Sequence, residues 1–136
     1  MLVLKVSWTR NPGPLSNTNM FNVTRIYTDA NGDSHFKDIQ IPLNDRGMVG
    51  RLSDPVPAKS LIFREVLPAY DWDFHPAPQR QYIVLLDGEI EIETSLGDKR
   101  IFRQGEILLV EDTTGKGHKT KNVLPTERKS LFITLD

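Results

Sequence analysis

The sequence predicts an all-β domain, a sandwich or barrel of short strands, and three observations support this. Nine glycines and nine prolines interrupt the chain too often for long helices. Short runs rich in β-branched and aromatic residues lie between them. From Glu89 to Thr94, glutamate alternates with isoleucine, which places both isoleucines on one face of a half-buried strand. We expect strands at 2–8, 22–27, 36–41, 61–66, 81–86, 89–94, 99–102, 107–110 and 130–135.

Turn-forming residues connect these runs. Asp87-Gly88 separates two strand-like segments by two residues and predicts a tight hairpin of type I′. Asn31-Gly32 predicts a slightly longer reversal, and further reversals are expected around Gly97 and Gly105. Residues 9–18 and 43–58 are predicted to be loops rich in proline and glycine.

Length and charge narrow the class of protein. At 136 residues the chain fits one domain spanning 1–136, with one hydrophobic core. The 17 basic and 18 acidic residues nearly cancel, so bulk charge indicates neither nucleic acid nor a membrane surface as a partner. Short charged runs such as Glu127-Arg128-Lys129 are interpreted as solvated turns or strand ends.

The absence of cysteine excludes disulfides, thiolate zinc sites and a cysteine nucleophile. The first residues, from Met1 to Trp8, lack the pattern of a signal peptide, and no stretch approaches the roughly 18 apolar residues of a membrane helix. We therefore expect a cytoplasmic protein.

Two of the three histidines occupy positions where a barrel presents functional side chains. His75 begins a proline-rich stretch directly ahead of a predicted strand, and Pro76 favours an extended backbone at His75. His118 follows a flexible Gly-Lys-Gly turn after an apolar strand. His35 is expected to be an exposed loop residue. The hypothesis is that His75 and His118 face one cavity.

At these histidines the chain resembles the cupin superfamily. The first cupin motif contains two histidines, a glutamate and a glycine, and here His75, Ala77, Gln81 and Gly88 stand at those places. Residues 97–110, continued to His118, are similar to the second motif. The resemblance implies a cupin-type double-stranded β-helix, a jelly-roll barrel. Its core would span about 60–135, and the strands and loops of 1–59 would pack on it or contribute to a dimer.

The cupin resemblance also raises the question of metal. Metal-binding cupins hold iron, manganese, nickel or zinc with three histidines and a glutamate, of which this chain retains only His75 and His118. Ala77 has no ligand atom, and the neutral amide of Gln81 is a poorer ligand than a carboxylate. A divalent ion would therefore be bound weakly, and an unmetallated polar cavity is the favoured interpretation.

Other side chains are candidates for ligand contact. Arg64 lies in an otherwise apolar strand, and if it points inward it could clamp a carboxylate, although strand alternation also allows outward exposure. Trp72 could form a wall of the site, and Gln81 would offer both a donor and an acceptor from the face of His75. The candidate ligand site is therefore Arg64, Trp72, His75, Gln81 and His118.

Three functional hypotheses remain open. The first is a cupin that binds a small polar molecule without demonstrated chemistry. The second is a metal-dependent enzyme of oxygenase or isomerase type using His75 and His118, or an acid–base enzyme using them without metal. The third is a homodimeric interaction module with a vestigial pocket, because an open barrel leaves strand edges that need pairing or protection. The fold does not choose among these functions.

Overall fold

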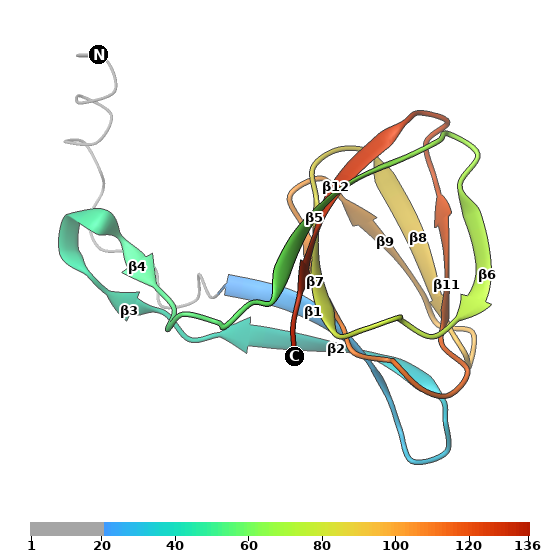
Figure 1. Ribbon diagram of the computed structural model, residues 1–136, viewed down its shortest axis with the longest axis horizontal. Coiled ribbons are helices and arrows are strands. Elements are labelled where there is room, and N and C mark those ends of the chain that lie inside the picture. Colours follow the sequence, from blue (N-terminus) through green and yellow to red (C-terminus); the bar gives the residue numbers. More distant parts are fainter. Residues whose placement is uncertain (1–20) are drawn as a thin grey trace.

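A computed structural model describes residues 21–136, and within them the chain folds into two facing β-sheets and a projecting arm (Figure 1). The larger sheet has the order β2-β1-β10-β7-β12-β5 and the smaller one β6-β11-β8-β9. The larger sheet contains β1 (Phe21–Thr28), β2 (Ser34–Ile41), β5 (Ser60–Val66), β7 (Gln81–Leu85), β10 (Ile107–Val110) and β12 (Arg128–Thr134). The smaller sheet contains β6 (Asp71–His75), β8 (Glu89–Thr94), β9 (Lys99–Arg103) and β11 (His118–Asn122).

The strand order is that of a jelly roll. From β5 onward, the strands pair as β5-β12-β7-β10 in one sheet and β6-β11-β8-β9 in the other. This is the eight-stranded double-sheet arrangement in which cupins are built. The predicted all-β, cupin-type barrel is therefore confirmed. β1 and β2 extend the larger sheet, with β1 parallel to β10.

The core lies between the two sheets and follows from strand alternation. Ile90 and Ile92 are 3% and 2% exposed, whereas the glutamates between them are only half-buried, as the alternating pattern predicts. They pack with buried side chains from the opposite sheet: Ile26, Leu85, Leu108 and Val110. The same alternation brings polar side chains inward at the ends of the strands.

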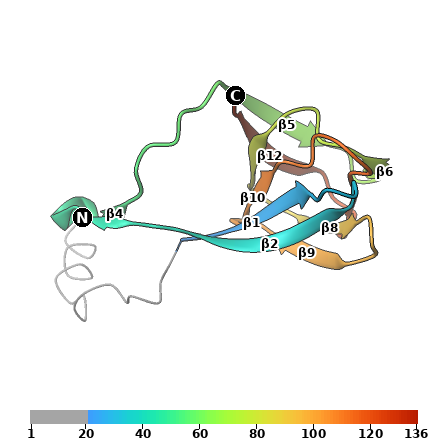
Figure 2. The same ribbon diagram turned by 90° about the horizontal axis from the view of Figure 1, so that it is seen from below.

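A short arm leaves the barrel between β2 and β5. It contains β3 (Asn44–Asp45), a 3-10 turn at Gly47–Val49 and β4 (Arg51–Leu52), and it extends away from the two sheets (Figure 2). The prediction of a plain loop at 43–58 was wrong here, because β3 and β4 pair as a small antiparallel ribbon. The turn between them has no buried residue.

Besides the ribbon of β3 and β4, two strands of the smaller sheet were not anticipated. β6 and β11 both lie in the smaller sheet, yet their sequences, Asp-Trp-Asp-Phe-His and His-Lys-Thr-Lys-Asn, have no apolar β-branched run. They are extended because β6 pairs with β11, and β11 pairs in turn with β8. Local strand propensity does not reveal such pairing. Of the nine predicted strands, the eight within the described residues are found, and 2–8 lies outside the described residues.

The predicted hairpin at Asp87-Gly88 was wrong. β7 and β8 lie in different sheets, so the chain crosses from one sheet to the other at this point. Of the two residues Asp87 and Gly88, only Gly88 has a positive φ, of 70°. A type I′ turn needs a positive φ at both central residues. A β-carbon on Gly88 would lie 3.1 Å from the Arg128 side chain, so this glycine makes room for a buried arginine. No helix among residues 21–136 is long and apolar enough to cross a membrane.

Candidate functional site

A cavity of about 160 Å³ lies between the two sheets. Its middle is apolar, with walls that include Ile83, Ile92, Leu108 and Phe132. All five predicted ligand-site residues line it: Arg64, Trp72, His75, Gln81 and His118. Among residues 21–136, no aspartate or glutamate lines it. A dry apolar cavity of about this size holds a molecule as large as benzene, so the space admits a compact organic ligand.

The ladder register sorts the lining into tiers along the barrel. At one end His118 is opposite both His75 and Thr94, and in the other sheet Gln81 is opposite Val110 and Thr134. Two residues further along, the inward positions are apolar at Ile83, Leu108 and Phe132, and Thr120 on β11 is the polar member of this tier. At the far end, Arg64 is opposite Ser130, and Arg128 lies two residues beyond Ser130 on the same strand. The cavity thus has an imidazole and amide end, an apolar middle and an arginine end.

The two imidazoles lie together, as the sequence predicted. Their ring centroids are 5.0 Å apart, with the planes inclined by 50°. His75 also stacks on Trp72 at 3.7 Å. The Nδ1 of His75 donates to the backbone carbonyl of Asp73 at 2.7 Å. Because a carbonyl only accepts, this bond fixes the proton on Nδ1 and leaves Nε2 with a free lone pair in the neutral ring.

The ring of His118 is held by a buried carboxylate. Its Nδ1 donates to Asp112 Oδ2 at 2.6 Å, and the two side chains are 8% and 0% exposed. The second carboxylate oxygen, Asp112 Oδ1, is buried without a hydrogen-bond partner in the described structure. Nε2 of His118 is therefore the ring atom that remains available, so each imidazole can accept a hydrogen bond or a proton from a ligand.

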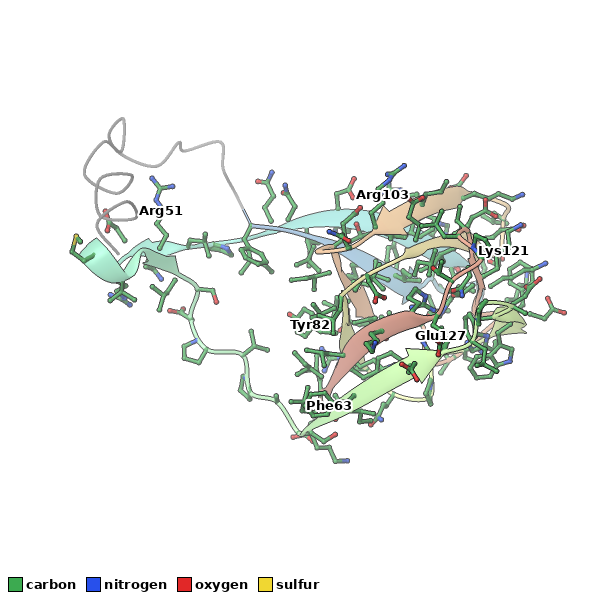
Figure 3. The ribbon with its side chains drawn as sticks, turned by 90° about the horizontal axis from the view of Figure 1, so that it is seen from above. Arg51, Phe63, Tyr82, Arg103, Lys121 and Glu127 are labelled. Atoms are coloured by element: carbon green, nitrogen blue, oxygen red, sulfur yellow. The ribbon has the colours of Figure 1, made fainter. Side chains whose placement is uncertain are left out.

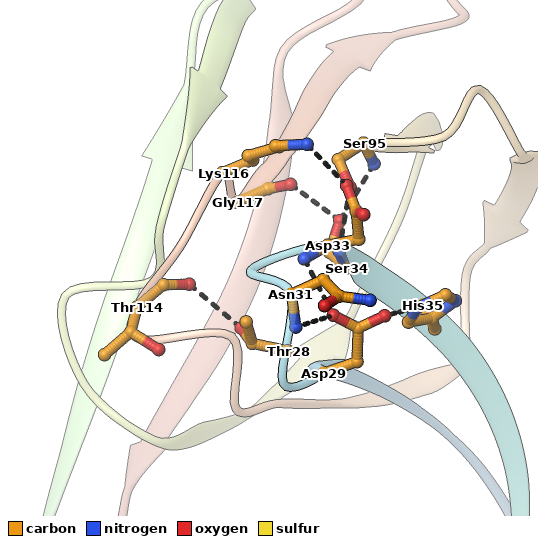
Figure 4. Close-up of polar contacts among 10 residues, drawn as sticks. All are labelled: Thr28, Asp29, Asn31, Asp33, Ser34, His35, Ser95, Thr114, Lys116 and Gly117. Carbon is orange, nitrogen blue, oxygen red and sulfur yellow. Dashed lines mark hydrogen bonds and ion pairs between the residues drawn. The ribbon is translucent and has the colours of Figure 1, made fainter.

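A polar cluster fixes the loop that precedes His118 (Figure 4). Ser34 Oγ donates to the Gly117 carbonyl at 2.7 Å, and Thr28 Oγ1 donates to the Thr114 carbonyl at 2.9 Å. The ammonium group of Lys116 contacts Asp33 Oδ1 at 2.9 Å. These contacts tie the loop to the β1–β2 hairpin, so the position of His118 depends on residues some eighty positions away in the sequence.

Gln81 is one of several buried polar residues at the imidazole end. It is 4% exposed, and its side-chain amide makes no hydrogen bond to another residue of the part of the chain that the structure describes. Its neighbour Tyr82 faces the opposite side of the sheet and lines a groove there. The amide of Gln81 is therefore open to the cavity, where it can offer a donor and an acceptor to a ligand.

The arginine end contains a residue that sequence analysis misplaced. Arg128 was interpreted as part of a solvated charged run, but it is 2% exposed and lines the cavity. Its Nε donates to Asn122 Oδ1 at 2.9 Å, while Nη2 is buried without a partner in the described structure. Burial lowers the pKa of Arg128 below its ordinary value, and the nearby positive charge of Arg64 lowers it further. Arg128 shares one face of β12 with Ser130 and Thr134, which are also buried, and this mostly polar alternation does not mark the face as inward in the sequence.

His35 also departs from its prediction as an exposed loop residue. It lies in β2, where Nε2 contacts Asp29 Oδ2 at 2.6 Å and the ring packs on Tyr27. It belongs to the polar cluster of the β1–β2 hairpin, and it is absent from the cavity lining.

The residues at the imidazole end do not form the ligand set of a catalytic metal. Among residues 21–136 no group of three or more histidine, aspartate or glutamate side chains is placed to hold an ion. Asp112 is engaged by His118 Nδ1, so the third donor beside the two Nε2 atoms would be the neutral amide of Gln81. A catalytic metal site has three protein ligands and an open position, and usually a charged or third imidazole ligand. The metal assignment to His75 and His118 therefore stays a prediction, and no step of the proposed function relies on it.

The strand order and the cavity between the sheets together define a domain of cupin type. The sequence matches no family model and no curated protein.

Solved structures of cupin domains are similar in fold. The Schizosaccharomyces pombe Cnp3 cupin domain is 13% identical with a TM-score of 0.47, over 87% of this chain and 85% of that chain. A cupin 2 conserved barrel protein from Salinispora arenicola is 15% identical with a TM-score of 0.45, over 91% and 87% of the two chains. Drosophila melanogaster CENP-C, solved bound to CAL1, is 14% identical with a TM-score of 0.47, over 98% and 94%. The fold assignment itself depends on the strand order described above.

Proposed function

We propose that the barrel binds a small polar organic molecule in the cavity between its sheets. The observation that carries this proposal is the imidazole end of the cavity, where the amide of Gln81 makes no hydrogen bond to another of residues 21–136. The amide atoms of Gln81 are not among the fully enclosed unpaired atoms of these residues, so they are open to the cavity. A ligand group that bonds to Gln81 and to the Nε2 atoms of His75 and His118 uses these three polar groups together.

The shape of the cavity defines the ligand. The apolar middle accepts a ring or a short branched chain, and burial of that body supplies binding free energy of roughly 25 cal/mol for each Å² of apolar area removed from water. Polar groups at the two ends then fix the orientation, as in most small-molecule sites. This design needs no covalent step, and the two imidazoles act as hydrogen-bond acceptors.

The proposal is tested by titrating ¹⁵N-labelled protein with benzamide, phenol and benzoate and following amide chemical shifts. We expect at least one compound to give saturable shifts at the cavity residues on β7, β10 and β11. Gln81→Leu should lower the affinity for that compound by about five- to tenfold, because one hydrogen bond is lost. Gln104→Leu is the matched control, since Gln104 is exposed in the turn after β9. Absence of saturable shifts with all three compounds, or shifts confined to other surfaces, would contradict the proposal.

A further inference from the structure

The two arginines of the cavity form a cationic pair for which residues 21–136 supply no ion-pair partner. Arg64 lies 4.9 Å from the centroid of the Tyr70 ring and Arg128 lies 5.5 Å from it, so both guanidinium groups share one aromatic side chain. Neither makes an ion pair with a carboxylate of residues 21–136. Tyr70 and, to a smaller extent, Asp87 act to raise the pKa of Arg128, and Asp87 Oδ1 accepts a hydrogen bond from the Lys129 backbone.

Such an arrangement is unfavourable unless an anion completes it. Buried arginines are almost always paired, because removing the charge from water costs several kcal/mol that only a partner offsets. Two like charges near one ring also repel each other. Arg128 is held in place by Asn122 and by the space over Gly88, so it cannot leave the interior for solvent without disturbing the β7–β8 crossing.

We infer that the ligand of the barrel is a small carboxylate, with its oxygens bound by Arg128 and Arg64 and its apolar body in the middle of the cavity. This inference depends on the proposed function and specifies the class of ligand. A guanidinium presents parallel N–H donors that match the two oxygens of a carboxylate. Nη2 of Arg128 is enclosed without a partner, whereas Nη1, which makes no hydrogen bond to another of residues 21–136 and is not enclosed, is the donor that the cavity presents to the anion. Arg64 is half-buried at the edge strand β5, so it completes the anion site from the side nearest to solvent.

The apolar middle favours a carboxylate over a bare oxyanion. Ile83, Ile92, Leu108 and Phe132 separate the arginine end from the imidazole end, and inorganic phosphate would leave these walls uncovered. A compact carboxylic acid such as benzoate covers them and also neutralises the arginines.

The test compares benzoate with its neutral analogue benzamide in the intact protein. We expect benzoate to bind at least about tenfold more tightly, because charge-assisted hydrogen bonds are lost in the amide. Arg64→Gln should reduce this preference severalfold, and Arg128→Gln should abolish it. Arg103→Gln is the matched control, since Arg103 is exposed on the outer face of β9 and its removal should leave the preference unchanged.

Arg64→Gln keeps the test decisive if Arg128→Gln does not fold. Equal binding of benzamide and benzoate, or a preference for benzoate that is undiminished in Arg64→Gln, would overturn the assignment of a carboxylate ligand and leave the proposed function standing. Inorganic phosphate that binds as tightly as benzoate would also overturn it, in favour of a bare oxyanion. If none of these compounds binds, the proposed function fails together with this inference.

Discussion

Gly117 packs directly against the backbone of His75. A β-carbon at position 117 would lie 2.0 Å from the His75 carbonyl oxygen, and the φ of Gly117 is +73°. This contact joins the end of β6 to the start of β11, and so it sets how closely the two imidazoles approach.

Gly117→Ala should therefore disturb the site more than an ordinary glycine substitution. Gly97 is the control, because it also has a positive φ, of +96°, but no atom lies within 4 Å of its added β-carbon. Both variants pay the strain of positive φ, about 1 kcal/mol. We expect only Gly117→Ala to lose about a further 2 kcal/mol in the free energy of unfolding. Only this variant should also shift the NMR resonances of the His75 and His118 rings. Equal stability of the two variants in urea denaturation would argue against this role of Gly117.

The buried pair of Asp112 and His118 predicts a large asymmetry between two substitutions. Asp112→Ala leaves His118 Nδ1 buried without an acceptor, and we expect a loss of about 2–4 kcal/mol in the free energy of unfolding. Asp112→Asn retains an acceptor oxygen and should cost less. Asp38→Ala, at an exposed ion pair with Arg100, should change stability by no more than about 0.5 kcal/mol. A ranking in which Asp38→Ala costs as much as Asp112→Ala would refute the structural importance of the buried pair.

The environment of Glu111 predicts that the free energy of unfolding falls at acidic pH. Burial raises the pKa of Glu111, but hydrogen bonds and charges from Arg25 and Arg80 outweigh it, so the pKa lies below its ordinary value of 4.5. A lowered native pKa means that the unfolded chain binds the proton more readily. The stabilisation is therefore fully present above about pH 4.5 and is lost as the pH falls through the native pKa.

We expect the urea midpoint to be flat from pH 7 to pH 5 and to fall below that range. Glu111→Gln should lower the midpoint at pH 7 and reduce the fall on acidification. Asp29 and Asp33, whose pKa values are also lowered through hydrogen bonds from His35 and Lys116, account for part of the remaining slope. A fall that is as steep in Glu111→Gln as in the wild type would show that other carboxyl groups dominate it.

Metal content distinguishes the remaining enzyme hypothesis from simple binding. With two imidazoles and one amide as donors, we expect well under one equivalent of iron, manganese, nickel or zinc after dialysis. Elemental analysis of the wild type and of His75→Ala measures this directly. A stoichiometric metal in the wild type that disappears in His75→Ala would restore the metal-dependent reading.

The outer face of the larger sheet predicts self-association. Phe63 and Leu61 on β5 are 80% and 52% exposed, and Figure 3 shows Phe63 and Tyr82 on the side of the barrel toward the arm. A groove of about 260 Å³ between this face and the arm has apolar walls that include Val56 and Tyr82. An exposed apolar face of this kind is typical of an interface.

We expect light scattering to give twice the 15.5 kDa mass of the chain, with a second copy covering this face. Phe63→Asp should shift the protein to the monomer, whereas Ile101→Asp, on the outer side of the smaller sheet, should not. A monomeric wild type at high micromolar concentration would contradict this expectation.

The sequence by itself determined the all-β class, eight of the strands and the pair of histidines. Period-two alternation in 89–94 and the glycine positions require extended, frequently reversed backbone, and those are local properties. The resemblance of residues 75–118 to the cupin motifs then brought His75 and His118 to one cavity. These inferences depend on neighbours in the chain and on a known pattern, and both are visible in the sequence alone.

Only the tertiary structure decided the chemistry of the cavity. β6 and β11 are strands because they pair with each other, and Asp87-Gly88 is a crossing between sheets because β7 and β8 pair elsewhere. Arg128 is interior because Gly88, far away in the chain, leaves it space. Whether a charged residue faces water or a cavity depends on which strand lies opposite, and such long-range pairing has no local signature.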